Sequence, residues 1–238
     1  MLADAGRGWI MMEAMRSNEA LDTAQDCAAS ADTVTRLTGM GDDGAQIFTT
    51  DREQVGLVPQ CARAKDLCFE FNCRTRSSDQ VRQQALLSEL LGAVGPNCAL
   101  AAPFMVDNGF NVLIGANFRS GPNLVILDSA PVTFGDNVVV GSNVHLTAVG
   151  HPLDATLRNQ GIEYAYPITI GNNVVIGANT CILPGVTIGD NCVIGAGSVV
   201  NRSLPAGSLA AGNPCRPLHP ITAADRGRYL EPSTLVVG

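Results

Sequence analysis

The 238 residues are enough for one sizeable domain with an appendage, and a composition of 46% hydrophobic and 16% charged residues excludes a disordered chain. The net charge of −7 argues against a nucleic-acid-binding protein, which would present a basic face. The sequence has no run of about 18 apolar residues, and its first residues lack the apolar stretch of a secretory signal. We therefore expect a cytoplasmic protein without membrane spans.

The first part of the chain divides into an extension and a helical segment. Residues 1–46 show no clear periodicity and predict an extension that is partly disordered, whereas residues 47–95 predict helices. One helix is expected near 57–72 and a second over 78–92. In the second, Ser78 or Asp79 can cap the first turn, and an apolar stripe follows at helical spacing: Val81, Ala85, Leu86 and Leu90.

A six-residue repeat dominates residues 96–216. An aliphatic side chain recurs at the third position of ITIGNN, VVIGAN, TCILPG, VTIGDN and CVIGAG, and the pattern returns upstream at Ile114, Phe134, Val140 and Leu146. A period of six fits neither a helix nor an ordinary hairpin, but it fits short strands joined by Gly and Asn turns. Three hexapeptides would then form one triangular coil, and stacked coils would form a parallel β-helix. Its narrow aliphatic core should seldom admit an aromatic ring.

One segment interrupts the repeat without changing its phase. Residues 147–167 break the period, yet Leu146 and Ile170 remain a whole number of hexapeptides apart. We expect a loop extruded from the β-helix near 147–167, and long loops on a rigid scaffold often carry function. Residues 217–238 are expected to form a C-terminal tail.

Histidine and cysteine are the reactive side chains that deserve comparison. The eight cysteines form no CxxC pair, so we expect free thiols rather than a zinc site. His151 opens the extruded segment, and an imidazole that titrates near neutrality can take a proton from an alcohol during acyl transfer. A hydrogen-bonded loop histidine with no catalytic role is the alternative. His145 should lie on another face and His219 in the tail, so no metal site is expected.

Several motifs are more specific than the hexapeptide itself: RAKDLCFEFN at 63–72, NVLIGANF at 111–118, VGHPLDATLRNQG at 149–161, PITIGNNVVIG at 167–177, PGVTIGDNCVIGAGSVV at 184–200 and AAGNPCR at 210–216. With them, the block from about Phe48 to Pro217 resembles the maltose and galactoside O-acetyltransferases, the sugar-acetylating branch of the hexapeptide-repeat acyltransferases. The resemblance implies a left-handed parallel β-helix, a homotrimer with active sites between subunits, and acetyl-CoA as the acetyl donor.

The same resemblance implies roles for individual residues. His151 would be the base that removes a proton from a sugar hydroxyl, which then attacks the acetyl thioester directly. The acceptor would contact Asp51, Asp107, Gly121, Asn123, Ser129 and Glu163. CoA would contact Ala178, Ala196, Asn201, Arg202 and Arg216, where arginines suit the anionic phosphates.

Three departures from the family pattern concern the acceptor. Gly121 stands where the family has an Asn, Ser129 replaces an acid of the galactoside enzymes, and Val175 replaces a frequent Trp. We therefore predict weak, broad activity on simple sugars, with Asp107 as the main polar anchor. Two alternatives remain at this point, namely a related acetyltransferase with a xenobiotic or amino-sugar acceptor, and a non-catalytic β-helix scaffold.

Overall fold

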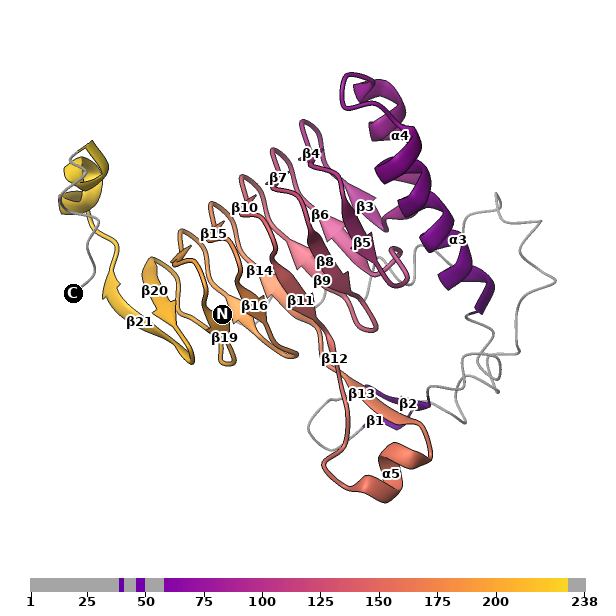
Figure 1. The fold of residues 1–238 in the computed structure, drawn as a ribbon. Coiled ribbons are helices and arrows are strands. Elements are labelled where there is room, and N and C mark those ends of the chain that lie inside the picture. Colours follow the sequence, from indigo (N-terminus) through magenta and orange to yellow (C-terminus); the bar gives the residue numbers. More distant parts are fainter. Residues whose placement is uncertain (1–38, 41–45, 50–57, 231–238) are drawn as a thin grey trace.

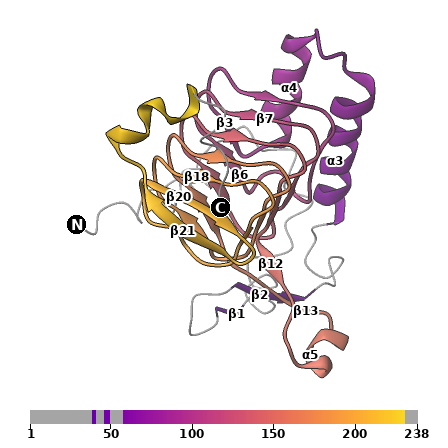
Figure 2. The same ribbon diagram turned by 60° about the vertical axis from the view of Figure 1, so that its left-hand side comes forward.

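The computed structural model describes residues 39–40, 46–49 and 58–230, and most of these residues wind into a triangular solenoid (Figure 1). Three sheets form its sides, and each coil contributes one short strand to each sheet. Figure 2 shows the stacked coils obliquely. The predicted mainly β fold, a parallel β-helix with an N-terminal helical segment and an extruded loop, is confirmed.

Each sheet consists of very short strands. The seven-stranded sheet contains β4 (Ala99–Leu100), β7 (Arg119–Ser120), β10 (Val139–Val140), β15 (Val175–Ile176), β18 (Val193–Ile194), β20 (Ser208–Gly212) and β21 (Cys215–Pro220), of which only β21 is antiparallel to its neighbour. The β5–β19 sheet contains β5 (Phe104–Val106), β8 (Leu124–Leu127), β11 (His145–Thr147), β16 (Cys181–Ile182) and β19 (Val199–Val200). The β3–β17 sheet contains β3 (Ala93–Val94), β6 (Val112–Ile114), β9 (Val132–Phe134), β14 (Ile168–Ile170) and β17 (Thr187–Ile188).

The core is built by the alternation of side chains along each strand. Val140, Ile176 and Ile194 are in register on adjacent strands and are all buried, whereas their neighbours Val139 and Val175 point outward. The parallel register places buried aliphatic side chains above one another from coil to coil. The hexapeptide period therefore produces one continuous core along the solenoid axis.

The coils have two lengths. Phe134 pairs with Ile114, twenty residues earlier, whereas Ile188 pairs with Ile170, eighteen residues earlier. The two additional residues lie between the β5–β19 sheet and the β3–β17 sheet. These longer coils hold Phe104, Phe118 and Phe134 in the core, with Phe118 and Phe134 edge to face at 5.0 Å. The prediction that rings seldom fit is therefore wrong for this end of the solenoid.

Stacked asparagines stabilise the other two corners. At the Asn137 corner, which joins the β3–β17 sheet to the seven-stranded sheet, side-chain amides are hydrogen-bonded from coil to coil in the order Asn97, Asn117, Asn137, Asn173 and Asn191. At the Gly121 corner, which joins the seven-stranded sheet to the β5–β19 sheet, Asn123, Asn143 and Asn179 form a second ladder. All eight adopt positive φ, which asparagine tolerates better than most residues.

Helices close the end of the solenoid where the first coils lie (Figure 1). The chain forms α3 (Val58–Phe69), a π-helical turn η1 (Glu70–Arg74) and α4 (Gln80–Leu90), close to the predicted bounds. Asn72 anchors this cap, since its side chain donates to the carbonyl of Phe104 and accepts from the Phe104 N–H. In α4, Asp79 is the N-cap, and Leu86, Leu87 and Leu90 are buried. Val81 and Ala85 are exposed, so the predicted stripe is wrong at these two positions.

The segment 147–167 projects from the solenoid as an arm (Figure 1). It contains β12 (Val149–Gly150), α5 (Ala155–Asn159) and β13 (Ile162–Ala165). Strand β13 pairs with β12 and with β2 (Gln46–Thr49), which in turn pairs with β1 (Gly39–Met40). The chain then re-enters the solenoid in register at β14, so the predicted extrusion with unchanged phase is confirmed. After β21, the chain ends its described part in the 3₁₀ helix η2 (Ala223–Leu230).

Candidate functional site

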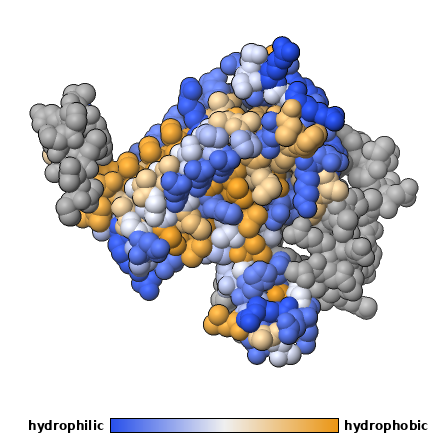
Figure 3. Space-filling model, viewed as in Figure 1, coloured by the Kyte–Doolittle hydropathy of each residue, from blue (hydrophilic) through white to orange (hydrophobic). Residues whose placement is uncertain are grey.

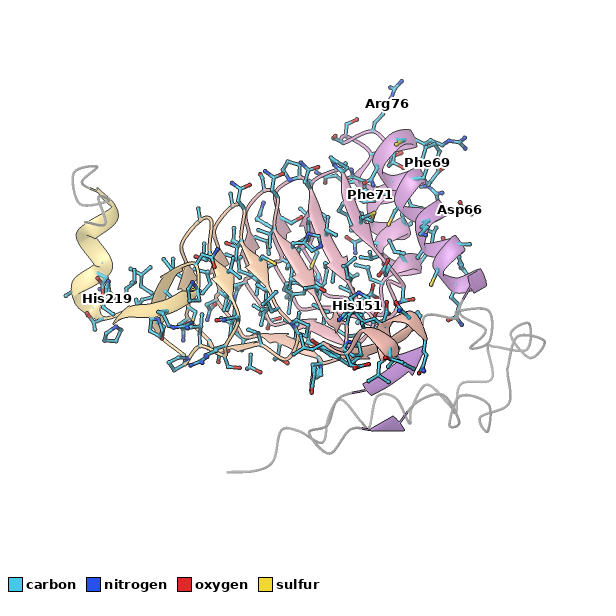
Figure 4. The ribbon with its side chains drawn as sticks, turned by 60° about the horizontal axis from the view of Figure 1, so that its bottom comes forward. Asp66, Phe69, Phe71, Arg76, His151 and His219 are labelled. Atoms are coloured by element: carbon cyan, nitrogen blue, oxygen red, sulfur yellow. The ribbon has the colours of Figure 1, made fainter. Side chains whose placement is uncertain are left out.

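His151 lies at the base of the arm, directly after β12, and its side chain is 60% exposed (Figure 4). Its Nδ1 is 3.8 Å from Oε1 of Glu163 on β13, whose side chain is only 12% exposed. This contact places the Nδ1 side of the ring toward the arm. The geometry therefore leaves Nε2 as the ring nitrogen that can face a bound molecule.

Local hydrogen bonds fix the backbone that follows His151. Arg158 donates from Nη1 to the carbonyl oxygens of Pro152 and Leu153, at 2.9 and 2.6 Å. Asp154 caps α5 by accepting a hydrogen bond from the Leu157 N–H at 3.0 Å. The side chains of residues 153–160 are exposed, but the turn is held by these defined contacts.

Asp107 and Ser129 lie below the arm at the same corner of the solenoid. We call this corner, which joins the β5–β19 sheet to the β3–β17 sheet, the arm corner; it comprises residues 107–111, 128–131 and 148–167 in successive coils. Ala148 donates its N–H to Leu127, so the arm begins one coil above the turn that carries Ser129. Asp107 and Ser129 are both half-buried. The structure therefore gathers Asp107, Ser129, His151 and Glu163 along one edge.

The arm corner also contains a carboxylate that the sequence analysis missed. Asp128 is fully buried, and its oxygens accept hydrogen bonds from the backbone N–H groups of residues 107, 108 and 109 at 3.0, 2.8 and 2.7 Å. Burial raises the pKa of Asp128 to about 6, although these hydrogen bonds act in the opposite direction. The twenty-residue spacing of Ile114 and Phe134, which exceeds three hexapeptides, is the signal in the sequence that marks this enlarged corner.

Gly121 and Asn123 lie at the Gly121 corner, on the opposite side of the β5–β19 sheet from the arm corner. A Cβ at Gly121 would lie 2.6 Å from Ser142 Oγ and 2.8 Å from Ser142 N, so coil stacking itself favours glycine here. Asn123 donates to Asn143 in the amide ladder. Both residues thus have structural roles, and within one chain the width of a sheet separates them from His151.

The residues expected to contact CoA fall into two groups. Ala178 and Ala196 are stacked on adjacent coils of the Gly121 corner, where the carbonyl of Ala178 accepts from Gly197 N–H. Asn201, Arg202 and Arg216 are exposed on the last coil and β21. Arg216 donates to Oδ1 of Asn201 at 3.1 Å, so this arginine is oriented before any ligand arrives. Asp51 lies outside the described residues.

The metal alternative finds no geometric support in the described part of the chain. No group of three His, Cys, Asp or Glu residues there is arranged to hold an ion. His219, on β21, is remote from His151 in Figure 4. The seven cysteines within the described ranges are free thiols, and burial raises the pKa of Cys68, Cys181 and Cys215. None of the helices seen between residues 58 and 230 is long and apolar enough to cross a membrane.

Comparison with known proteins identifies close similarities over most of the chain. Family models match as "Maltose acetyltransferase hexapeptide capping motif" over residues 55–95, "Hexapeptide repeat of succinyl-transferase" over 109–148 and "Bacterial transferase hexapeptide (six repeats)" over 167–202. Galactoside O-acetyltransferase of Escherichia coli is 44% identical over 176 residues, which cover 74% of this chain and 86% of that protein.

Solved structures show the same similarity. A galactoside acetyltransferase in complex with coenzyme A superposes with a TM-score of 0.74 at 43% identity, covering 78% of this chain and 92% of the other. A maltose O-acetyltransferase from Clostridium difficile gives a TM-score of 0.68 at 41% identity, covering 70% of this chain and 88% of the other.

Proposed function

We propose that this chain, which belongs to the maltose and galactoside O-acetyltransferase family, is a sugar acetyltransferase. It would transfer an acetyl group from acetyl-CoA to a hydroxyl of a sugar or a similar small acceptor. Membership itself makes the chain an acetyl-CoA-dependent acetyltransferase. The observation that carries the finer proposal is the pairing of an exposed His151 with a largely buried Glu163 at the base of the arm.

His151 acts as the general base. Its Nε2 takes the proton of the acceptor hydroxyl while the hydroxyl oxygen attacks the carbonyl carbon of the acetyl thioester. The tetrahedral intermediate then collapses with cleavage of the carbon–sulfur bond, and the imidazolium returns its proton to the departing sulfur of CoA. Glu163, 3.8 Å from Nδ1, lowers the energy of the imidazolium while the ring holds this proton.

The acceptor lies along the arm corner. Asp107, half-buried two coils below the arm, can accept hydrogen bonds from two sugar hydroxyls, and Ser129 can both donate and accept. Glu163 can also accept from a hydroxyl on the side that faces away from the imidazole, and Asp51 is proposed as a further contact. These polar groups give the acceptor its orientation, since the deprotonated hydroxyl must meet the thioester in line.

Transfer takes place between subunits of a homotrimer. A sheet face of about six extended residues spans roughly 20 Å, so one chain cannot bring Gly121, Ala178 and Ala196 to its own His151. A neighbouring subunit can supply this second corner and the CoA site, to which Asn201, Arg202 and Arg216 contribute. A cyclic arrangement repeats the same pairing three times.

The surface of the solenoid supports this assembly. The outward side chains of two sheets include exposed apolar groups, among them Val139, Val175 and Met105, whereas the β3–β17 sheet presents threonines outward. Figure 3 shows hydrophobic side chains both on the solenoid and on the arm. Two apolar faces for each subunit suit a closed ring, in which each subunit has two neighbours. We place the trimer in the cytoplasm, where thiols such as those of this chain stay reduced.

Release of CoA in the presence of candidate acceptors tests the proposal. Acetyl-CoA is incubated with the protein and glucose, maltose or a galactoside, the free thiol is followed with a chromogenic reagent, and the acetylated sugar is identified by mass spectrometry. We expect sugar-dependent thiol release with every one of these acceptors. Thiol release that no sugar increases, in a protein that binds CoA normally, would refute a carbohydrate acceptor.

A further inference from the structure

The turn that carries Asp107 is held by a single buried carboxylate from the next coil, Asp128. Both oxygens of Asp128 are used: Oδ1 accepts from the N–H groups of Asp107 and Asn108, and Oδ2 accepts from the N–H group of Gly109. Three consecutive backbone donors therefore converge on one side chain. Such a cradle fixes the position of each of these peptide groups.

Further contacts to the same residue tighten the turn. The backbone carbonyl of Asp128 accepts from Nδ2 of Asn108 at 3.0 Å and from Nδ2 of Asn111 at 2.8 Å. Gly109 has a φ of +81°, and a Cβ there would lie 2.4 Å from the carbonyl oxygen of Leu90. The turn is thus confined between Asp128 on one side and the end of α4 on the other, with little freedom to adjust.

This arrangement costs the protein stability and therefore calls for a reason. A fully buried carboxylate, with no cation among its partners in the described residues, is expensive even when it accepts several hydrogen bonds. At the Asn137 corner, Asp136 accepts from the N–H of Ala116 at 2.7 Å with an exposed carboxylate, so coils can be joined without burying one. The burial of Asp128 occurs where the turn also presents Asp107 to the proposed acceptor site.

We propose that Asp128 is a positioning residue for acceptor binding, which holds the 107–109 backbone so that the Asp107 carboxylate meets the acceptor hydroxyls. The inference rests on the proposed function, because it takes Asp107 as an acceptor contact. Asp128 itself does not touch the acceptor. Its loss should weaken acceptor binding much more than CoA binding, because the CoA residues lie on other corners and coils.

The test compares Asp128→Asn with Asp136→Asn as a matched control, since both remove a carboxylate that accepts backbone N–H groups between coils. An Asn at 128 keeps one accepting oxygen but turns an NH₂ group toward a backbone donor. Hydrogen exchange of the amides at 107–109 is measured by mass spectrometry, and KM is measured separately for sugar and acetyl-CoA near pH 8. Should Asp128→Asn not fold, Asn111→Ala loosens the same turn more mildly.

We expect faster exchange at 107–109 and an acceptor KM raised by about tenfold or more in Asp128→Asn, because small displacements of positioning groups are costly. The KM for acetyl-CoA should change by less than about twofold, and Asp136→Asn should change neither constant. Unchanged exchange at 107–109, or faster exchange with an unchanged acceptor KM, would overturn the inference. Failure of the proposed function is distinguishable, because the wild type itself would then transfer no acetyl group to sugars.

Discussion

The buried carboxylate of Asp128 predicts an unusual dependence of stability on pH. Burial raises its pKa from the ordinary 3.8 to about 6, so the folded protein binds a proton at Asp128 more tightly than the unfolded chain does. Between these two values the folded state carries more protons, and stability must fall as the pH rises. The slope is at most about 1.4 kcal/mol for each pH unit, so the contribution of Asp128 to the unfolding free energy falls by about 2 kcal/mol between pH 4 and pH 6.5.

Asp128→Asn isolates this contribution, because an amide does not titrate in this range. Urea unfolding of wild type and variant is followed at several pH values from 4 to 7 and at one protein concentration, since assembly also affects apparent stability. The unfolding free energy of wild type minus that of the variant should decrease by about 2 kcal/mol as the pH rises from 4 to 7. A difference that stays constant, or that increases with pH, would show that the three backbone hydrogen bonds outweigh burial and would refute the reasoning.

Three further predictions concern single side chains. His151→Ala should lower kcat by about 10²- to 10⁴-fold while leaving CoA affinity, measured by calorimetry, nearly unchanged. His219→Ala is the control, and a His151→Ala protein that keeps about a third of wild-type turnover would exclude His151 as the base. Gly121→Asn should lower the melting temperature, because its Cβ would lie 2.6 Å from Ser142 Oγ, and a melting temperature equal to that of the wild type would show that this corner adapts. Ser120→Ala should raise the unfolding free energy by about 1 kcal/mol in urea titrations, because the buried Ser120 Oγ has no hydrogen-bond partner in the described structure; a destabilised variant would contradict this.

The repeat was predictable because its physical causes are local. A six-residue alternation of aliphatic residues with Gly and Asn specifies strand, inward side chain and turn within each hexapeptide. Ile170 therefore pairs with Ile188, and Ile176 with Val140, without reference to distant parts of the chain. The arm at 147–167 was predictable for the same reason, since the phase of the repeat is preserved across it. Asp79 as a helix cap is likewise a short-range feature.

The sequence also indicated His151, through its place at the start of the arm and through the family motif around it. It did not indicate the partner of His151, because Glu163 reaches the ring only after β13 folds back beside β12. The prediction that Val81 belongs to a buried stripe failed for a similar reason. Helical spacing gives the direction of each side chain relative to the others, but the packing of α4 on the first coils decides which side of the helix is covered.

The meeting of residues from separate coils at one corner is set by the packing of the coils and not by any local pattern. Asp128 and residues 107–109 are about one coil apart in sequence, and the closure of the enlarged coils brings them within hydrogen-bonding distance. The same closure separates Gly121 from His151 by a sheet face, although both are expected near the acceptor. The period, and with it the solenoid, can be predicted from local sequence, because each hexapeptide satisfies its own backbone preferences. Which residues come together at each corner depends on coil length and on stacking, and no single hexapeptide encodes these.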